Sequence, residues 1–242
     1  MNKISIAVAG VLMLLLSRLV LAGVMVESSR VVFSAADPER TLMLFNSNAY
    51  PVIVQSWVDD GSPDGTPENA INSPVMPLPG IFRLEPGERK SLRLLATQMP
   101  LPTDREVLYW LNIYEIPPAD ARLPKEAMLV KVAVRLQLKL FCRPAHLELS
   151  VDDVAEKQQF SIIRQPGLLA LKVTNPTPYY ATFDSVEVTD GSESQQVNVG
   201  MLAPFASKTL RLNGNQMDFP KKIHFLLIND DGNRVERNGT LR

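Results

Sequence analysis

Short apolar runs alternate with turn residues along most of the chain, at intervals of about ten residues. This spacing is typical of β-sandwiches, and helical periodicity is nearly absent after residue 22. The sequence therefore predicts an all-β protein. A first series of seven strands is predicted at residues 30–33, 41–45, 52–58, 81–84, 90–95, 107–114 and 128–141. A second series is predicted at residues 146–150, 160–163, 168–174, 181–188, 195–199, 208–212 and 222–228.

Each series has the number of strands of one immunoglobulin-like sandwich. Between the two series lies Arg143-Pro144-Ala145, where the proline ends strand pairing and fixes the direction of the chain. We therefore predict two sandwich domains, at residues 23–143 and 144–242, joined by a short and rigid linker. Trp57, on the third predicted strand, is expected in the core of the first sandwich. No cysteine stands on the second or sixth strand, which excludes an antibody-type domain.

The first 22 residues have the organisation of a secretory signal. Lys3 precedes an apolar run at residues 4–16, and the small or apolar residues at 20–22 suit cleavage after Ala22. The run is shorter than the roughly 20 residues that span a bilayer, and Arg18 follows it. An uncleaved membrane anchor is the alternative. We predict that residues 1–22 are a signal peptide and that the mature chain is exported and soluble.

Charge and cysteine content exclude some classes of function. The chain has 25 basic and 26 acidic residues, and the predicted signal holds two basic ones, Lys3 and Arg18, so the mature net charge is about −3. A nucleic-acid-binding surface would be basic and clustered, so no nucleic-acid partner is predicted. The single cysteine, Cys142, cannot form an intramolecular disulfide. We interpret it as a small apolar side chain at a strand end, not as a reactive thiol.

The predicted strand at residues 128–141 is much longer than the usual five or six residues. Its apolar side chains share one parity and its polar ones take the other, which is the period of a strand. The apolar series is Met128, Val130, Val132, Val134, Leu136, Leu138 and Leu140. A long apolar edge strand could pair with another chain, whereas a central strand would turn this face to its own core. The pattern alone leaves both interpretations open.

Other features of the chain offer little chemistry. The acidic segment at residues 59–65 does not have the twelve-residue spacing of a calcium loop and is predicted to be a solvated turn. His146 and His224 have no partner at metal-ligand spacing, so no metal or cofactor is predicted. There is no serine elbow, no glycine-rich phosphate loop and no histidine beside an obvious nucleophile. We predict no catalytic residue and no enzymatic activity.

Seven short motifs, in register along the chain, resemble the signatures of periplasmic pilus-assembly chaperones of the chaperone/usher pathway. The motifs are Arg30-Val31-Val32-Phe33, Arg83-Leu84-Glu85-Pro86-Gly87, Asp104-Arg105-Glu106, Ile116-Pro117-Pro118, Lys139-Leu140-Phe141-Cys142-Arg143-Pro144, Asn175-Pro176-Thr177-Pro178-Tyr179-Tyr180 and Ile228-Asn229-Asp230. The resemblance covers essentially the whole mature chain. It implies two immunoglobulin-like domains in an L shape, with a cleft between them and an edge strand that is donated to pilus subunits lacking their own last strand.

The resemblance also implies roles for individual residues. Arg30 and Lys139 match the basic pair that grips the C-terminal carboxylate of a subunit. The donor-strand positions are Val130, Val132, Val134 and Leu136. An interdomain ionic cluster is implied at Glu106, Arg143 and Asp230. Because Lys139 has the opposite parity to the valines, a bulge, strand twist or a cleft around the strand end is needed to orient it.

The resemblance further implies partners and a compartment. The expected partners are pilus subunits and an outer-membrane usher, with self-association of the subunit-free protein as a further expectation, and the expected compartment is the periplasm. The short stretch between Pro118 and Met128 resembles the short-loop branch of the family. The chain departs from many relatives in its slightly acidic charge, and from some in lacking a cysteine pair in the second domain.

Two other functions remain as alternatives at this stage. The first is a fibre subunit or adhesin built from immunoglobulin-like domains. Such a subunit needs a donor extension, and Arg30 lies only eight residues after Ala22, which leaves little room for one. The second is a carbohydrate-active enzyme, whose paired carboxylates could converge in the fold from distant positions.

Overall fold

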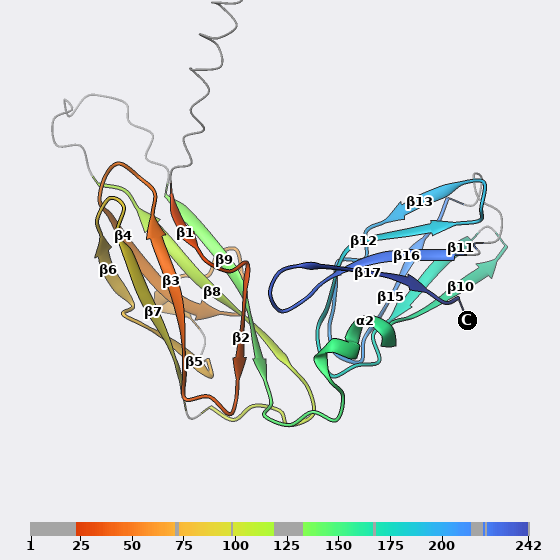
Figure 1. Cartoon of the computed structure of the whole chain (residues 1–242), viewed down its shortest axis with the longest axis horizontal. Helices are drawn as coiled ribbons and strands as arrows, with labels where there is room; N and C mark the ends of the chain where they lie inside the picture. The colour runs from red at the N-terminus through yellow and green to blue at the C-terminus, as the bar shows by residue number, and fades with distance from the viewer. Residues whose placement is uncertain are drawn as a thin grey trace, which may run out of the picture.

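The protein folds into two β-sandwiches, which stand at an angle to each other with a gap between them (Figure 1). A computed structural model describes residues 23–70, 73–97, 99–118, 133–166, 168–213, 220 and 222–241. The predicted all-β class and the two immunoglobulin-like sandwiches are confirmed. No helix in these ranges is long and apolar enough to cross a membrane.

The first sandwich is built from two sheets. One has the strand order β1-β3-β7-β5 and the other the order β2-β9-β8-β4-β6. The strands are β1 (Val24–Val26), β2 (Arg30–Ser34), β3 (Glu39–Asn46), β4 (Val52–Asp59), β5 (Val75–Leu78), β6 (Ile81–Leu84), β7 (Arg89–Ala96), β8 (Val107–Ile116) and β9 (Val134–Arg143), with a 3-10 turn, η1 (Pro67–Asn69).

The core of this sandwich forms where apolar side chains of one parity meet between the sheets. In β4, for example, Val52, Val54 and Val58 belong to it. Trp57 is buried, as predicted, but it has the opposite parity and lies outside this cluster. It is only 7% exposed, because the guanidinium of Arg135 covers its ring at 5.0 Å on the outer face of the sheet.

The second sandwich pairs a three-stranded sheet, β10-β11-β15, with the sheet β13-β12-β16-β17, in which β14 also pairs with β12. Its core includes three phenylalanine rings in mutual contact, from Phe160, Phe183 and Phe225. The elements are η2 (Val151–Asp153), α2 (Val154–Lys157), β10 (Gln159–Gln165), β11 (Leu168–Thr174), β12 (Ala181–Thr189), β13 (Ser194–Val197), β14 (Met201–Leu202), β15 (Ser207–Arg211), β16 (Lys222–Ile228) and β17 (Arg234–Gly239).

Most predicted strands overlap an observed strand, but the predicted strand at residues 146–150 does not exist. Leu147 and Leu149 pack against the second core without a partner strand, and the carbonyl of Leu149 accepts a hydrogen bond from the Tyr179 hydroxyl at 2.6 Å. The alternating apolar residues therefore belong to an extended segment that is fixed by side-chain contacts and not by pairing with a strand. The chain then enters η2, where the Ser150 side chain caps the turn.

Strand β9 connects the two sandwiches and is covered unequally on its two edges. Strand β8 pairs with it from Val134 to Cys142, which is all of β9 except its last residue. Strand β2 runs parallel to it on the other edge, but only from Lys139 to Arg143. Among the described residues, no strand pairs with that outer edge between Val134 and Leu138. The predicted part of this strand at residues 128–132 lies outside the described residues.

Candidate functional site

The two faces of β9 have different surroundings. Side chains at even positions, such as Leu138 and Leu140, belong to the core of the first sandwich. Side chains at odd positions lie on the opposite face, where the ring of Phe141 lies 5.6 Å from that of Tyr180 in the second sandwich. The pairing with β8 has no bulge in this region. Lys139 therefore takes its orientation from the regular pleat of the strand and shares the face that looks toward the second sandwich.

Arg30 and Lys139 come together where β2 joins β9, because they are direct register partners on the parallel strands. The Nη1 atom of Arg30 donates to the carbonyl of Ile228 at 3.1 Å, and its guanidinium lies 5.9 Å from the centroid of the Phe141 ring. Its Nε atom is buried and has no hydrogen-bond partner among the described residues. Two neighbouring cations, one with an unsatisfied donor, favour an anionic ligand such as a carboxylate.

Both cations are held in surroundings that disfavour their charge. Burial lowers the pKa of Arg30, although the charge of Asp230 opposes this shift. Burial also lowers the pKa of Lys139, and the positive charge of Arg30 lowers it further. Within the described part of the chain, Lys139 makes no ion pair or hydrogen bond. An anion bound between the two side chains would offset both the burial and the mutual repulsion.

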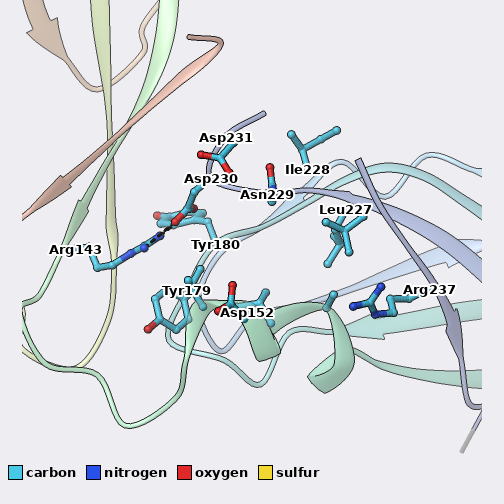
Figure 2. Close-up of a pocket in the computed structure, with 14 residues that line it drawn as sticks. Arg143, Asp152, Tyr179, Tyr180, Leu227, Ile228, Asn229, Asp230, Asp231 and Arg237 are labelled. Carbon is cyan, nitrogen blue, oxygen red and sulfur yellow. Dashed lines mark hydrogen bonds and ion pairs between the residues drawn. The ribbon is translucent and has the colours of Figure 1, made fainter. Parts of the chain in front are cut away.

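Glu106, Arg143 and Asp230 form an ionic cluster between the sandwiches. The Nε atom of Arg143 donates to Glu106 Oε1 at 2.6 Å. Its Nη1 and Nη2 atoms donate to the two carboxylate oxygens of Asp230, at 2.8 and 3.0 Å (Figure 2). Glu106 Oε2 accepts from the backbone N–H of Tyr180 at 2.8 Å. The structure thus brings together all three residues of the predicted cluster, across the boundary between the sandwiches.

The burial of this cluster is reflected in its titration. Burial raises the pKa of Glu106, while the charge of Arg143 and the N–H of Tyr180 oppose the shift. Burial lowers the pKa of Arg143, but its hydrogen bonds to Asp230 and the charge of Glu106 outweigh this effect and leave the pKa above its ordinary value. Arg143 therefore stays charged and pairs with two carboxylates at the hinge.

A cavity of about 470 Å³ adjoins the cluster on the side of the second sandwich (Figure 2). This volume falls within the range of ligand pockets, about 300 to 1,000 Å³. Figure 2 shows Asp230 and Asp231 on the turn between β16 and β17 and Asp152 across the cavity from them. The lining residues are Arg143, Val151, Asp152, Val154, Ala155, Tyr179, Tyr180, Leu227, Ile228, Asn229, Asp230, Asp231, Val235 and Arg237.

The predicted donor positions differ in how far they leave the sandwich. Val134, beside the unpaired edge of β9, is 51% exposed. Leu136 is partly buried and packs against the first core, so it lies where the core ends. Val130 and Val132 lie outside the described residues. One apolar face of the strand therefore passes from the core of its own sandwich to an exposed position, and the two interpretations of the sequence pattern each fit a different part of it.

Two features that the sequence analysis singled out are organised differently from a binding site. The thiol of Cys142 is fully buried in the first core, and burial, with a smaller effect of the Glu106 charge, raises its pKa to about 12. It is therefore an unreactive apolar side chain, as predicted. No group of His, Cys, Asp and Glu among the described residues is arranged to hold a metal ion.

The loop at residues 59–65 is more ordered than a solvated turn. Asp60, Ser62 and Asp64 are exposed, as predicted, but Asp59 is only 3% exposed. Its carboxylate accepts from Trp57 Nε1 at 2.8 Å and from Arg135 Nη2 at 2.8 Å. The sequence analysis assigned no role to Arg135, because its position on the polar parity of the strand does not distinguish it from a solvent-exposed charge.

Comparison with known proteins identifies the two halves of the chain. The model of the pili and flagellar-assembly chaperone, PapD N-terminal domain, matches residues 23–148. The model of the pili assembly chaperone PapD, C-terminal domain, matches residues 153–239. A probable fimbrial chaperone of Escherichia coli strain K12, YadV, is 31% identical over 224 residues, which cover 91% of each chain.

Solved structures give the same result. The CupB2 chaperone of Pseudomonas aeruginosa is 36% identical, with a TM-score of 0.74, and the match covers 90% of this chain and 100% of CupB2. The Salmonella enterica SafB chaperone, solved in complex with the SafA pilin, is 29% identical, with a TM-score of 0.72 over 91% of this chain and 97% of the other. With both sandwiches matched, this chain belongs to the pilus-assembly chaperones of the chaperone/usher pathway.

Proposed function

We propose that this chaperone holds pilus subunits by lending them the outer edge of β9, in the periplasm and without a catalytic step. The observation that carries the proposal is the edge between Val134 and Leu138, which has no partner strand among the described residues and bears an exposed valine. The similar SafB chaperone was solved with a pilin, which supports a subunit as the partner here. No observation favours a fibre subunit or an enzyme.

The energetics of such an edge suit a subunit that lacks a strand. Each backbone hydrogen bond to the incoming sheet contributes about 0.5 to 1.5 kcal/mol net, and each fully buried valine about 1.5 to 3 kcal/mol. Several of these together give tight binding, since donor strands supply backbone partners and apolar side chains at once. We assign the inserted side chains to Val130, Val132, Val134 and Leu136.

We propose that Arg30 and Lys139 bind the C-terminal carboxylate of the subunit. Their buried, mutually repelling charges and the unsatisfied Nε of Arg30 support this role. A carboxylate held at this point would also set the register of the subunit against β9. Register matters because a shift by one residue would turn every inserted side chain to the wrong face.

The remaining assignments follow from the family and the linker. We propose a signal peptide at residues 1–22 and domains at residues 23–143 and 144–242, with Glu106, Arg143 and Asp230 holding the angle between them. The short stretch between Pro118 and Met128 supports the short-loop branch. Delivery to an outer-membrane usher, and self-association through the unpaired edge when no subunit is bound, complete the proposed cycle.

Co-expression with fimbrial subunits encoded beside this chain, followed by co-purification, tests the proposal. The subunit that the wild-type chaperone captures best is then co-expressed with the Lys139→Ala chaperone. Its periplasmic level should fall at least tenfold, because truncating one partner of a buried charge pair costs about 2 to 5 kcal/mol. Lys172→Ala, an exposed change on β11 of the second sandwich, is the matched control. Normal subunit accumulation with Lys139→Ala would contradict the carboxylate anchor.

A further inference from the structure

Arg135 makes an unusually complete set of contacts for a residue on an unpaired strand edge. It follows Val134 in β9, and its Nε donates to Asn112 Oδ1 at 2.8 Å. Its Nη1 donates to the carbonyls of Pro63 and Gly65, at 3.0 and 2.9 Å. Its Nη2 forms an ion pair with Asp59 at 2.8 Å. The guanidinium therefore ties β9 to the neighbouring strand β8 and to the loop after β4.

The partners of Arg135 are themselves buried and shared. The side chains of Arg135 and Asp59 are 18% and 4% exposed, so the ion pair is largely shielded from solvent. Asp59 Oδ2 also accepts from Trp57 Nε1, and Asp59 Oδ1 accepts from the N–H of Gly61 at 2.8 Å. Arg135 lies over the Trp57 ring at 5.0 Å. The planar guanidinium of Arg135 is thus fixed both by its hydrogen bonds and by its contact with the face of the Trp57 ring.

The loop at residues 59–65 is shaped around this cluster. A Cβ atom at Gly65 would lie 2.7 Å from Asp59 Oδ2 and 3.3 Å from Arg135 Nη2. Gly61, with a φ of +89°, lies against the Trp110 ring so closely that a Cβ would be 2.3 Å from its Nε1. Both glycines allow the backbone to approach side chains on the outer face of the sheet. The loop thus forms a fitted cap over the β9 segment that bears Arg135.

We propose that Arg135 is a positioning residue for subunit capture: it holds the unpaired part of β9 in a strand conformation before a subunit arrives. Between Val134 and Leu138 the strand has a partner on one edge only, whereas from Lys139 onward β2 pairs with the other edge. A segment paired on one side must otherwise be ordered during binding, at a cost in conformational entropy. The contacts of Arg135 are made by its side chain, which leaves the backbone edge free.

This inference rests on the proposed donor-strand function. Of its two readouts, hydrogen exchange does not depend on that function, whereas subunit capture does. Hydrogen exchange of the purified, subunit-free protein reports the order of β9 directly. In Arg135→Gln, the amides at positions 134–137 that donate to β8 should exchange at least tenfold faster than in the wild type, while those at positions 140–142, between β2 and β8, should keep their protection. Arg93→Gln removes an exposed ion pair on the other sheet and is the matched control, with no change expected in β9.

Subunit capture is the second readout, with the fimbrial subunit identified by co-purification. Arg135→Gln should bind it about tenfold more weakly, which corresponds to about 1.4 kcal/mol. Arg135→Lys keeps the charge but not the planar fork, so it should weaken capture to a similar degree while preserving the melting temperature better. This second variant keeps the test decisive if Arg135→Gln does not fold.

The outcomes separate this inference from the function on which it rests. Unchanged exchange at positions 134–137 in both variants would overturn the positioning role, whatever subunit binding does. Faster exchange with undiminished capture would overturn it too, since order in the edge would then not matter for binding. If the wild-type protein captures no subunit although exchange responds as expected, the donor-strand function fails and Arg135 is left with a structural role only.

Discussion

At the scale of single residues, Lys139 is an example of a side chain whose position destabilises the folded chaperone. Its pKa lies below the ordinary value because burial disfavours the ammonium group and Arg30 repels it. No described residue offsets this charge. A residue in such surroundings is better explained by the anion that it is proposed to bind than by the stability of the free chaperone.

Replacing Lys139 by methionine should therefore leave the free protein as stable as the wild type, or more stable, near neutral pH. The sign follows from linkage: between the lowered pKa and the ordinary 10.5, the folded wild type has lost a proton that the unfolded chain retains. The free energy of unfolding of the wild type should increase as pH rises through this window. The difference in stability between the wild type and Lys139→Met should therefore shrink. Thermal melting between about pH 7 and pH 10 measures this, with exposed Lys172→Met as control. A less stable Lys139→Met at neutral pH would contradict it.

The sequence distinguishes some of these residues better than others. Lys139 and Arg143 stand in a motif of the family, so the sequence alone is enough to propose roles for them. Arg135 has the same charge and the same parity as Lys139, yet its partners Asp59 and Asn112 are 76 and 23 residues away in sequence. Only the fold brings them together. The contact of the Arg135 guanidinium with the Trp57 ring was missed for the same reason.

At the scale of elements, β9 shows what an alternating pattern can and cannot predict. The pattern indicates a strand with one apolar face, and the structure bears this out from Val134 onward. It does not indicate where the core ends along that face. That point depends on the height of the opposing sheet, and the structure places it near Leu136, between buried Leu138 and exposed Val134.

The same face of β9 supplies a matched pair of variants. Leu138→Glu should bury a charge in the first core and destabilise the domain by about 4 kcal/mol or more. Val134→Glu, at a position 51% exposed, should change stability by about 0.5 kcal/mol or less but prevent subunit capture, because the charge would meet an apolar groove. Thermal melting and co-purification measure the two effects. Equal destabilisation by both changes, or capture by Val134→Glu, would count against the donor assignment of this face.

One strand missed by the sequence analysis lacks this kind of signal. β17 (Arg234–Gly239) has mostly polar, exposed side chains, so no apolar alternation indicates it. A turn signal was present, because Asp231-Gly232 precedes it and closes a hairpin with β16. The false strand at residues 146–150 shows the opposite case, in which apolar alternation exists but no neighbouring strand supplies hydrogen bonds.

At the scale of the whole molecule, two sandwiches and a proline linker could be predicted from sequence, but the contacts that set their angle could not. The turn between β16 and β17 reaches toward the first sandwich (Figure 1). At its tip, Gly232 has a φ of +84°, and a Cβ there would lie 2.6 Å from Ser29 Oγ of the first sandwich. The rings of Phe141 and Tyr180 also meet across the boundary between the sandwiches, with their centroids 5.6 Å apart. These contacts surround the Arg143 cluster on several sides.

The ionic cluster should therefore be the contact on which the interdomain angle depends most. Arg143→Ala leaves the Glu106 carboxylate, whose side chain is 2% exposed, without its cation. Removing one partner of a buried pair costs about 3 to 5 kcal/mol, so we expect looser domains and faster proteolysis. Small-angle scattering and limited proteolysis measure both. Arg234→Ala, which removes an ion pair from a residue 67% exposed on β17, is the control and should change neither.

The pH dependence of this variant identifies the cause. The pKa of Glu106 is raised by burial and held down by Arg143, so Arg143→Ala should raise it further. As pH falls through that raised pKa toward the ordinary 4.5, folded Glu106 takes up a proton before the unfolded chain does, and the variant should regain stability relative to the wild type. Adding Glu106→Gln to Arg143→Ala should restore much of the loss at neutral pH, because the buried charge is then gone. If neither acid nor Glu106→Gln recovers protease resistance, an uncompensated carboxylate is not what loosens the hinge, and the packing of Arg143 over Tyr179, at 4.9 Å, would be the contact that holds it.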